Sequence, residues 1–425
     1  MYAIRYDLSK SGFYQRDSRI DLYLRSGLVS VYYKYSRKVN YIFMTDALSP
    51  RSDYPCLGQS IYFNQASLGL LSNQTVAEMT EFLNKVARHG NLKMSDTKEA
   101  GFLDSLRGSV SRLLKAKPEN IAILSSASEL LSQVPKLCSP EPNSKIILIS
   151  TDFPSITRPW LISEKTDNLE ICFVNEDPNT DLTQTIIENI DSNTSVVCVS
   201  YVQFASGTRI DIKKLNKYTK EFGAKLVIDV TQAAGAIPIN VSEWNADILV
   251  CSGYKWLGGH GGIAFGWLSS ELLKKDPPTI GWFSNENPFD MDATKLALSK
   301  TAAKYTQSTI SYISAVGLQT AIQQLLNIKI LNILKHSDKL AKMLFSNLEG
   351  SDWKCFRKTT SKEFSSHIIS LMPPSADRLK STFEHLSKKG LICGIRNERL
   401  RISIAHYNDS NDIKYLGASL LHDLS

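Results

Sequence analysis

Short apolar runs alternate with longer amphipathic stretches through most of this 425-residue chain. The clearest runs are 121–124, 146–149, 196–199, 226–228 and 248–250. Continuous apolar runs of this length are typical of strands buried on both faces, and the helix-length segments between them favour parallel pairing. The pattern therefore predicts an α/β fold with a mostly parallel sheet.

The remaining periodicity predicts how the chain divides. Residues 76–86 and 103–114 have helical spacing, and 314–347 forms one long helical stretch. That stretch leads into a smaller α+β region containing the strand-like segments 365–371 and 400–404. We therefore predict a large domain over 56–311, a small C-terminal domain over 312–425, and an N-terminal extension over 1–55.

The extension changes how the net charge of +7 is interpreted. Residues 1–40 contain eight Lys or Arg and three Asp, so this segment alone supplies +5. No basic stripe with interleaved aromatic residues follows, which argues against a nucleic-acid partner. The extension itself has no clear period, and it is either a poorly ordered start or an arm that packs on a partner subunit.

Hydropathy and cysteine usage favour a cytoplasmic protein. No apolar stretch approaches the roughly 20 residues that cross a bilayer, and Asp7, Arg16 and Asp17 interrupt any signal-like pattern at the N-terminus. The seven cysteines are scattered without a CxxC pair. That spacing argues against both a metal site and a disulfide framework.

A lysine and an aspartate suggest the chemistry. Lys255 follows the run 248–250 and precedes a glycine-rich segment, while Asp229 ends the run 226–228. In an open parallel sheet, ligands bind beyond the carboxyl ends of the strands, where both residues fall. A lysine can form a Schiff base with the aldehyde of pyridoxal phosphate (PLP), and a carboxylate can keep its ring nitrogen protonated.

The residues around this pair resemble a known family. Asp229-Val230-Thr231-Gln232 followed by Ser252-Gly253-Tyr254-Lys255-Trp256-Leu257 is similar to the signature of class V aminotransferases, which are fold type I PLP enzymes. The resemblance covers roughly residues 60 to 420. It implies a seven-stranded sheet, PLP as cofactor, an amino-acid substrate, and a homodimer with shared active sites.

The resemblance also implies roles for individual residues. Besides Lys255 and Asp229 as catalytic groups, the cofactor-binding residues are Ala127, Ser128, Phe153, Gln232, Ser252, Tyr254, Trp282 and Thr309. Ala127 and Ser128 open a predicted helix, whose N-terminal N–H groups suit a phosphate. Trp282 and Thr309 are expected to reach the site of the neighbouring subunit. Arg401 is expected to bind the substrate carboxylate, with Arg399 on the same strand face in reserve.

The family performs several reactions, and two differences from the desulfurase pattern bear on which reaction this chain performs. Phe153 stands where desulfurase-like relatives place a histidine, and phenylalanine can stack but cannot move a proton. The loop that carries a reactive cysteine in desulfurases is missing, since 390–396 runs almost directly into Arg399. Both observations argue against a desulfurase, and the range of reactions in the family leads us to favour transamination or β-elimination of the carbon–sulfur lyase kind. A cysteine desulfurase using Cys393, an epimerase, and a non-catalytic dimeric scaffold are the alternatives.

Overall fold

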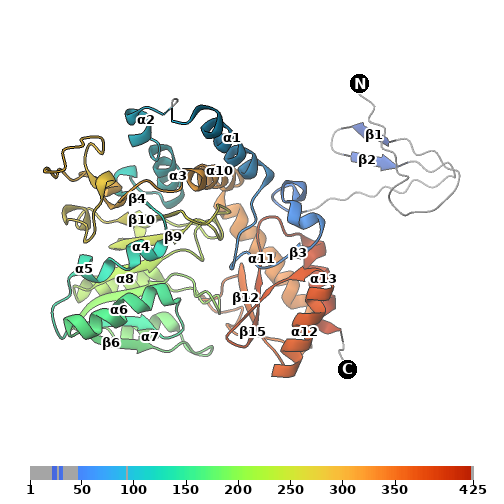
Figure 1. Ribbon diagram of the computed structural model, residues 1–425. Coiled ribbons are helices and arrows are strands. Elements are labelled where there is room, and N and C mark those ends of the chain that lie inside the picture. The colour runs from blue at the N-terminus through green and yellow to red at the C-terminus, as the bar shows by residue number, and fades with distance from the viewer. Residues whose placement is uncertain (1–21, 26–27, 32–45, 92–93, 423–425) are drawn as a thin grey trace. The chain divides into compact units, whose positions relative to one another are not determined.

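The computed structural model describes residues 22–25, 28–31, 46–91 and 94–422 (Figure 1). The chain forms two compact units, Met1–Asp46 and Ala47–Ser425. In the first unit the described residues form an antiparallel pair of strands, β1 (Leu22–Arg25) and β2 (Leu28–Val31). The predicted disorder or partner contact of 1–21 and 32–45 lies outside the described residues.

A seven-stranded sheet forms the centre of the second unit. Its strand order is β4-β10-β9-β8-β7-β5-β6, and β5 to β9 run parallel to one another. The strands are β4 (Ile121–Leu124), β5 (Lys145–Ile149), β6 (Glu170–Val174), β7 (Thr194–Ser200), β8 (Lys225–Asp229), β9 (Ile248–Ser252) and β10 (Ala264–Leu268). Five of these contain the five apolar runs, so the predicted α/β class and mostly parallel sheet are confirmed.

Two strands have no counterpart among the predicted runs. β6 is an edge strand that mixes exposed and buried positions, so it lacks a continuous apolar signal. β10 is antiparallel to both of its neighbours, β4 and β9. It contains Gly266 between aromatic residues, and glycine weakens the strand signal in a sequence.

Helices cover both faces of the sheet, which explains why its strands are apolar throughout. Alternate residues of each strand enter two separate cores: Ile147 and Ile149 pack in one, whereas Ile146 and Leu148 pack in the other. The first core contains α3 (Asp104–Leu114), α7 (Leu182–Glu188), α8 (Ile212–Glu221), α9 (Val241–Trp244) and α10 (Tyr312–Ile328). The second contains α4 (Ala127–Leu131), α5 (Val134–Cys138) and α6 (Pro154–Asp167).

The C-terminal part builds a third core around a small antiparallel sheet of order β11-β12-β15-β14. Its elements are α11 (Ile330–Asn347), β11 (Lys354–Cys355), β12 (Ile368–Met372), α12 (Ala376–Lys388), β13 (Leu391–Ile392), β14 (Gly394–Arg396), β15 (Arg399–Ser403) and α13 (Ser410–Leu421). β13 pairs instead with β3 (Ile61–Tyr62) in a parallel two-stranded sheet. The segment after β3 thereby runs from the small sheet toward Lys255.

The prediction of one helical stretch over 314–347 was wrong. α10 ends before Lys329, whose φ of 71° interrupts the helix, and α11 begins at Ile330. The two helices serve different cores, since α10 packs on the large sheet whereas Leu340 and Leu344 of α11 pack with the small one. Helical periodicity continues through Lys329, and no proline or glycine marks the break.

Both ends of the second unit meet. Residues just after Ala47 contact the segment before α13: Leu48 N–H donates to the carbonyl of His406 at 2.8 Å, and Ser49 Oγ lies 2.8 Å from His406 Nδ1. Arg51 forms an ion pair of 2.6 Å with Asp412. The remaining helices, α1 (Asn73–His89) and α2 (Asp96–Ala100), follow β3 in the chain, and α1 packs along α10.

Candidate active site

A cavity of about 110 Å³ opens at the carboxyl ends of the parallel strands. It is lined by Ser126, Ala127, Ser128, Phe153, Ser155, Ser200, Phe204, Asp229, Thr231, Gln232, Ser252, Tyr254 and Lys255. Eight of the eleven residues predicted for the site are in this lining; Arg401, Trp282 and Thr309 are not. Strand ends far apart in the sequence are therefore brought together as the sheet topology predicts.

Asp229 is a buried carboxylate at the end of β8. It accepts a hydrogen bond of 2.7 Å from Thr231 N–H, and Thr231 Oγ1 in turn accepts one of 3.0 Å from Ser252 N–H. Burial raises the pKa of Asp229, and the Thr231 hydrogen bonds and the Lys255 charge oppose that rise. Within the described part of the chain, no cationic side chain comes within 4 Å of Asp229 to form an ion pair. A buried carboxylate without an ion-pair partner is suited to bind a cationic N–H group of a ligand.

Lys255 lies in the same cavity and is 7% exposed. Burial lowers the pKa of its amine to about 8; the Asp229 carboxylate opposes this shift, and the Arg401 and Arg396 guanidinium groups reinforce it. The amine is thus partly neutral near neutral pH, which a nucleophile or base requires. Its Nζ lies 5.1 Å from the centroid of the Phe153 ring.

The segment after β3 holds the backbone of Lys255 in place through hydrogen bonds. Gln65 Nε2 donates to the Lys255 carbonyl at 3.0 Å, and Gly69 N–H donates to the Tyr254 carbonyl at 2.8 Å. Gln65 Oε1 accepts from the Tyr407 hydroxyl at 2.6 Å. The lysine is therefore held by residues from both ends of the second unit.

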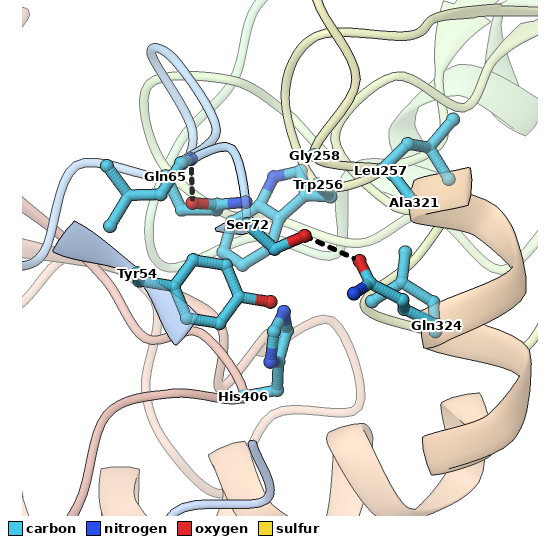
Figure 2. Close-up of a pocket in the computed structure, with 11 residues that line it drawn as sticks. Tyr54, Gln65, Ser72, Trp256, Leu257, Gly258, Ala321, Gln324 and His406 are labelled. Carbon is cyan, nitrogen blue, oxygen red and sulfur yellow. Dashed lines mark hydrogen bonds between the residues drawn. The ribbon is translucent and has the colours of Figure 1, made fainter. Parts of the chain in front are cut away.

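A second, much smaller cavity is lined by Gln65 and by Trp256, the residue that follows Lys255. Figure 2 shows Tyr54, Ser72, Gln324 and His406 around it, beside Trp256. Its volume of about 10 Å³ matches one water molecule at most. Trp256 Nε1 donates to Gln232 Oε1 at 2.8 Å, and Gln232 Nε2 donates to the Ala66 carbonyl at 3.1 Å. These hydrogen bonds hold Trp256 in place next to Lys255.

The opposite end of the main cavity carries hydroxyl groups and a helix start. Ser126 caps α4 by accepting from Glu129 N–H at 3.2 Å, which confirms the predicted helix start. Ser128 Oγ lies 2.8 Å from Ser155 Oγ. With Ser252 and Tyr254, these groups form a neutral, donor-rich end; Lys255 is the one basic side chain in the lining of this cavity. Such an environment suits a phosphate whose charge is compensated by N–H and O–H donors.

Phe153 is held over the cavity by a residue that the sequence did not indicate. The buried carboxylate of Asp152 accepts from Phe153 N–H at 2.6 Å, from Ser200 N–H at 2.8 Å and from Ser200 Oγ at 2.6 Å. Burial raises the pKa of Asp152 to about 6, against these hydrogen bonds. The Phe153 ring makes an edge contact with Phe204, with centroids 5.5 Å apart. The only sequence signal for Asp152 was its place directly after β5.

Arg401 lies beside the cavity rather than in its lining. It is 1% exposed, and its terminal nitrogens donate to the Phe204 carbonyl at 2.8 Å and to Ser67 Oγ at 2.5 Å. Burial, followed by the nearby Arg396 charge, lowers its pKa to about 10. The reserve residue Arg399 stacks on Phe356 instead, with 3.8 Å from Cζ to the ring centroid.

Trp282 and Thr309 are exposed, and neither is in the lining of the cavity of its own chain. Their predicted contact with a neighbouring subunit stays a prediction. No helix in the described ranges combines the length and the apolarity needed to cross a bilayer. Those ranges also contain no cluster of three or more His, Cys, Asp or Glu side chains arranged for a metal ion.

The cavity's residues fit PLP. A buried lysine, a buried carboxylate without an ion pair, an aromatic ring and a donor-rich end are the groups that the cofactor's aldehyde, ring nitrogen, ring face and phosphate require. The family model for "Aminotransferase class-V" matches residues 61–416. The chain belongs to this family of fold type I enzymes, and its cofactor is PLP.

Individual relatives differ in the activity for which they are named. The chain is 24% identical over 327 residues to an uncharacterized aminotransferase, YcbU, from Bacillus subtilis (strain 168), covering 73% of this chain and 80% of the relative. The apo structure of a cysteine desulfurase from Thermococcus onnurineus NA1 superposes with a TM-score of 0.77 at 23% identity, covering 87% and 96% of the two chains. The complex of the cystine C–S lyase C-DES with cysteine persulfide also gives 0.77, at 16% identity and coverage of 86% and 98%.

Proposed function

We propose that this protein acts on an α-amino acid by β-elimination of the carbon–sulfur lyase kind or by transamination. The observation that supports this proposal most directly is that Lys255 is the only strong base in the cavity lining. The other titratable groups there are Asp229 and Tyr254. Both reactions need one base that moves a proton on one face of the substrate. Bound PLP supplies the electron sink that stabilises negative charge at the substrate Cα.

The roles of the chain's own residues follow from their placement. The Lys255 amine, with a pKa of about 8, removes the proton from the substrate Cα. With PLP bound, Asp229 would hold a proton on its ring nitrogen, and Phe153 would stack on the ring and exclude water. Ala127, Ser128, Ser252 and Tyr254 would hold the phosphate, and Gln232 would contribute to holding the ring. Arg401 binds the substrate α-carboxylate; its Nε is buried without a hydrogen-bond partner among the described residues, so a donor remains for this task.

Two alternatives lack a residue that they need. Epimerisation needs a second acid or base on the other face of the substrate. Besides Lys255, the cavity lining contains only Asp229, which we assign to the ring nitrogen, and Tyr254, which is a poor base because burial raises its pKa. A desulfurase needs a reactive thiol, but Cys393 is buried in the small-domain core and burial raises its pKa to about 12. β14 and β15 are joined by only Asn397 and Glu398, both with positive φ, which leaves no room for a loop carrying a thiol.

We also propose a homodimer in which Trp282 and Thr309 reach the partner's site. Supporting this, the segment around Trp282 presents apolar side chains to solvent: Ile280 (47% exposed), Met291 (71%) and Leu296 (62%). Exposed apolar groups gathered along one segment are typical of an interface. Analytical ultracentrifugation of Trp282→Glu against the unchanged protein tests it, and a fully active monomer would contradict it. A cytoplasmic location stays a prediction.

The test of the reaction is an assay of amino acids with separate product readouts. Pyruvate with ammonia or sulfide, formed without a keto-acid acceptor, indicates elimination. Turnover that depends on an added keto acid indicates transamination. Lys255→Ala is the control and should abolish both. If no amino acid changes the cofactor absorbance or gives a product, the protein is the non-catalytic scaffold instead.

A further inference from the structure

Three arginines occupy one face of the β14–β15 hairpin. In this antiparallel pair Arg396 is opposite Arg399, and Gly394 is opposite Arg401. Residues directly opposite each other, and alternate residues along a strand, project from the same face of a sheet. The hairpin therefore carries three cations and one position without a side chain on the same face, and two of the cations, Arg396 and Arg401, reach the segment that contains Ser67.

Two of the three cations converge on one hydroxyl group. Ser67 Oγ accepts from Arg401 at 2.5 Å and from Arg396 at 3.1 Å. A Cβ atom on Gly394 would lie 3.1 Å from Asn64 Oδ1 and 3.8 Å from a terminal nitrogen of each arginine, so the absence of a side chain lets the two guanidinium groups come together beside Asn64. Arg399 does not take part, because it stacks on Phe356.

No carboxylate neutralises this pair. Across residues 46–91 and 94–422, neither Arg396 nor Arg401 has an Asp or Glu oxygen within 4 Å. Like charges held together in a partly buried place are unfavourable unless an anion binds between them. One α-carboxylate uses one arginine fork, so the second guanidinium group has capacity for a second anion.

We propose that Arg396 is a specificity-determining residue that binds a second anionic group, at the end of the substrate side chain, while Arg401 binds the α-carboxylate. The substrate class is thus the acidic amino acids, with a side-chain carboxylate or sulfur oxyacid. This inference rests on the proposed function, because it uses the same site. Arg401 is bonded to the carbonyl of Phe204, which lines the cavity, and Arg396 shares Ser67 with Arg401, so both guanidinium groups lie next to the cavity.

The exposure of the two arginines agrees with this division of roles. Arg401 is almost fully buried and fixed by the Phe204 carbonyl, which suits the constant part of every substrate. Arg396 is only half-buried and is the last residue of β14, next to the turn at Asn397 and Glu398. Its side chain can therefore adjust to side chains of different length.

The experiment compares matched substrate pairs on the holoenzyme: aspartate with asparagine, glutamate with glutamine, and cysteine sulfinate with cysteine. Cofactor absorbance and product formation are both recorded. We expect kcat/KM to favour the acidic member by about tenfold or more, the scale of one charge-assisted contact. Arg396→Gln should remove that preference and leave the neutral member within about twofold. Arg399→Gln, the same charge change on the same face, should leave the preference unchanged.

A second readout does not depend on turnover. Succinate should raise the melting temperature of the holoenzyme more than butyrate, which has the same chain length and one carboxylate, because binding to the native state stabilises it. Arg396→Gln should abolish the difference between the two acids.

The outcomes separate this inference from the proposed function. Equal use of acidic and neutral amino acids overturns the role of Arg396 and leaves the proposed function standing. An equal loss for all substrates in Arg396→Gln also overturns it, because Arg396 would then serve the α-carboxylate. If no amino acid reacts but succinate still stabilises the protein through Arg396, the anion site stands and the proposed reaction fails.

Discussion

Gly69 is in direct contact with the backbone of Lys255. A Cβ atom at Gly69 would come within 2.1 Å of the Lys255 carbonyl oxygen, which is closer than any real contact. The same carbonyl accepts from Gln65, and the glycine's own N–H donates to Tyr254. The position of the lysine therefore depends on a residue 186 positions earlier that has no side chain.

We expect Gly69→Ala to displace Lys255 and to lower the free energy of unfolding by about 1–3 kcal/mol, the usual cost of overpacking. PLP occupancy should fall with it. Gly108→Ala is the control: Gly108 lies in α3 with no atom near its Cβ position, so alanine should stabilise the protein slightly there. Chemical denaturation and cofactor absorbance measure both effects. Unchanged occupancy in Gly69→Ala would contradict the contact.

Asp229→Asn should retain PLP and reduce turnover on the order of 100-fold, the scale of a proton-holding group in catalysis. An amide cannot keep the ring nitrogen protonated. Asp181→Asn, at the exposed N-cap of α7, makes the same change away from the site and should have no effect. Steady-state kinetics at matched cofactor occupancy provide the measurement, and wild-type turnover in Asp229→Asn would refute the role.

The lowered pKa of Lys255 predicts a pH dependence. Cofactor attachment needs the neutral amine, so uptake of PLP by the apoprotein should speed up as the pH rises through about 8 and then level off. Between about 8 and the ordinary value of 10.5 the unfolded chain binds the extra proton, so the apoprotein should also gain stability as the pH rises. Lys255→Met should remove this stability increment. Uptake that is independent of pH would contradict the shift.

Arg401→Ala should lower kcat/KM by an amount equivalent to about 2–4 kcal/mol, because a desolvated bidentate contact is lost. Arg401→Lys should recover only part, since an ammonium cannot reproduce the fork. PLP occupancy should be nearly unchanged, because other residues hold the phosphate. If Arg401→Ala has wild-type kcat/KM while Arg399→Ala loses it, the carboxylate is bound by Arg399.

Cys393→Ser should leave turnover largely intact. Burial raises the pKa of this thiol to about 12, so almost no reactive thiolate forms. Cys355→Ser, at a partly exposed cysteine outside the cavity lining, is the comparison. Loss of sulfide or persulfide formation from cysteine in Cys393→Ser alone would restore the desulfurase assignment.

The strands and the centre of the site were predictable because their signals are local. Each of the five apolar runs lies in a strand. Asp229 is the last residue of β8, and Lys255 follows β9, the neighbour of β8 in the sheet. The break at Lys329 was not predictable, because it arises from two helices packing on different cores.

Residues that act through other residues also escaped prediction. Asp152 is important because its buried carboxylate meets Ser200 from another strand, a contact with no trace in either local pattern. Ser67 is similar: its hydroxyl matters only because two arginines more than 300 positions later converge on it. Such pairings depend on tertiary structure, which a single sequence does not encode in its periodicity.

The contacts between the two ends of the second unit predict how that unit responds to truncation. Leu48, Ser49 and Arg51 are bonded to His406 and Asp412, so the first residues after Ala47 hold the segment around His406 in place. A protein shortened to start at Cys56 would lose these contacts. Tyr407, whose hydroxyl donates to Gln65 and so supports the contact of Gln65 with the Lys255 carbonyl, would then be held less firmly.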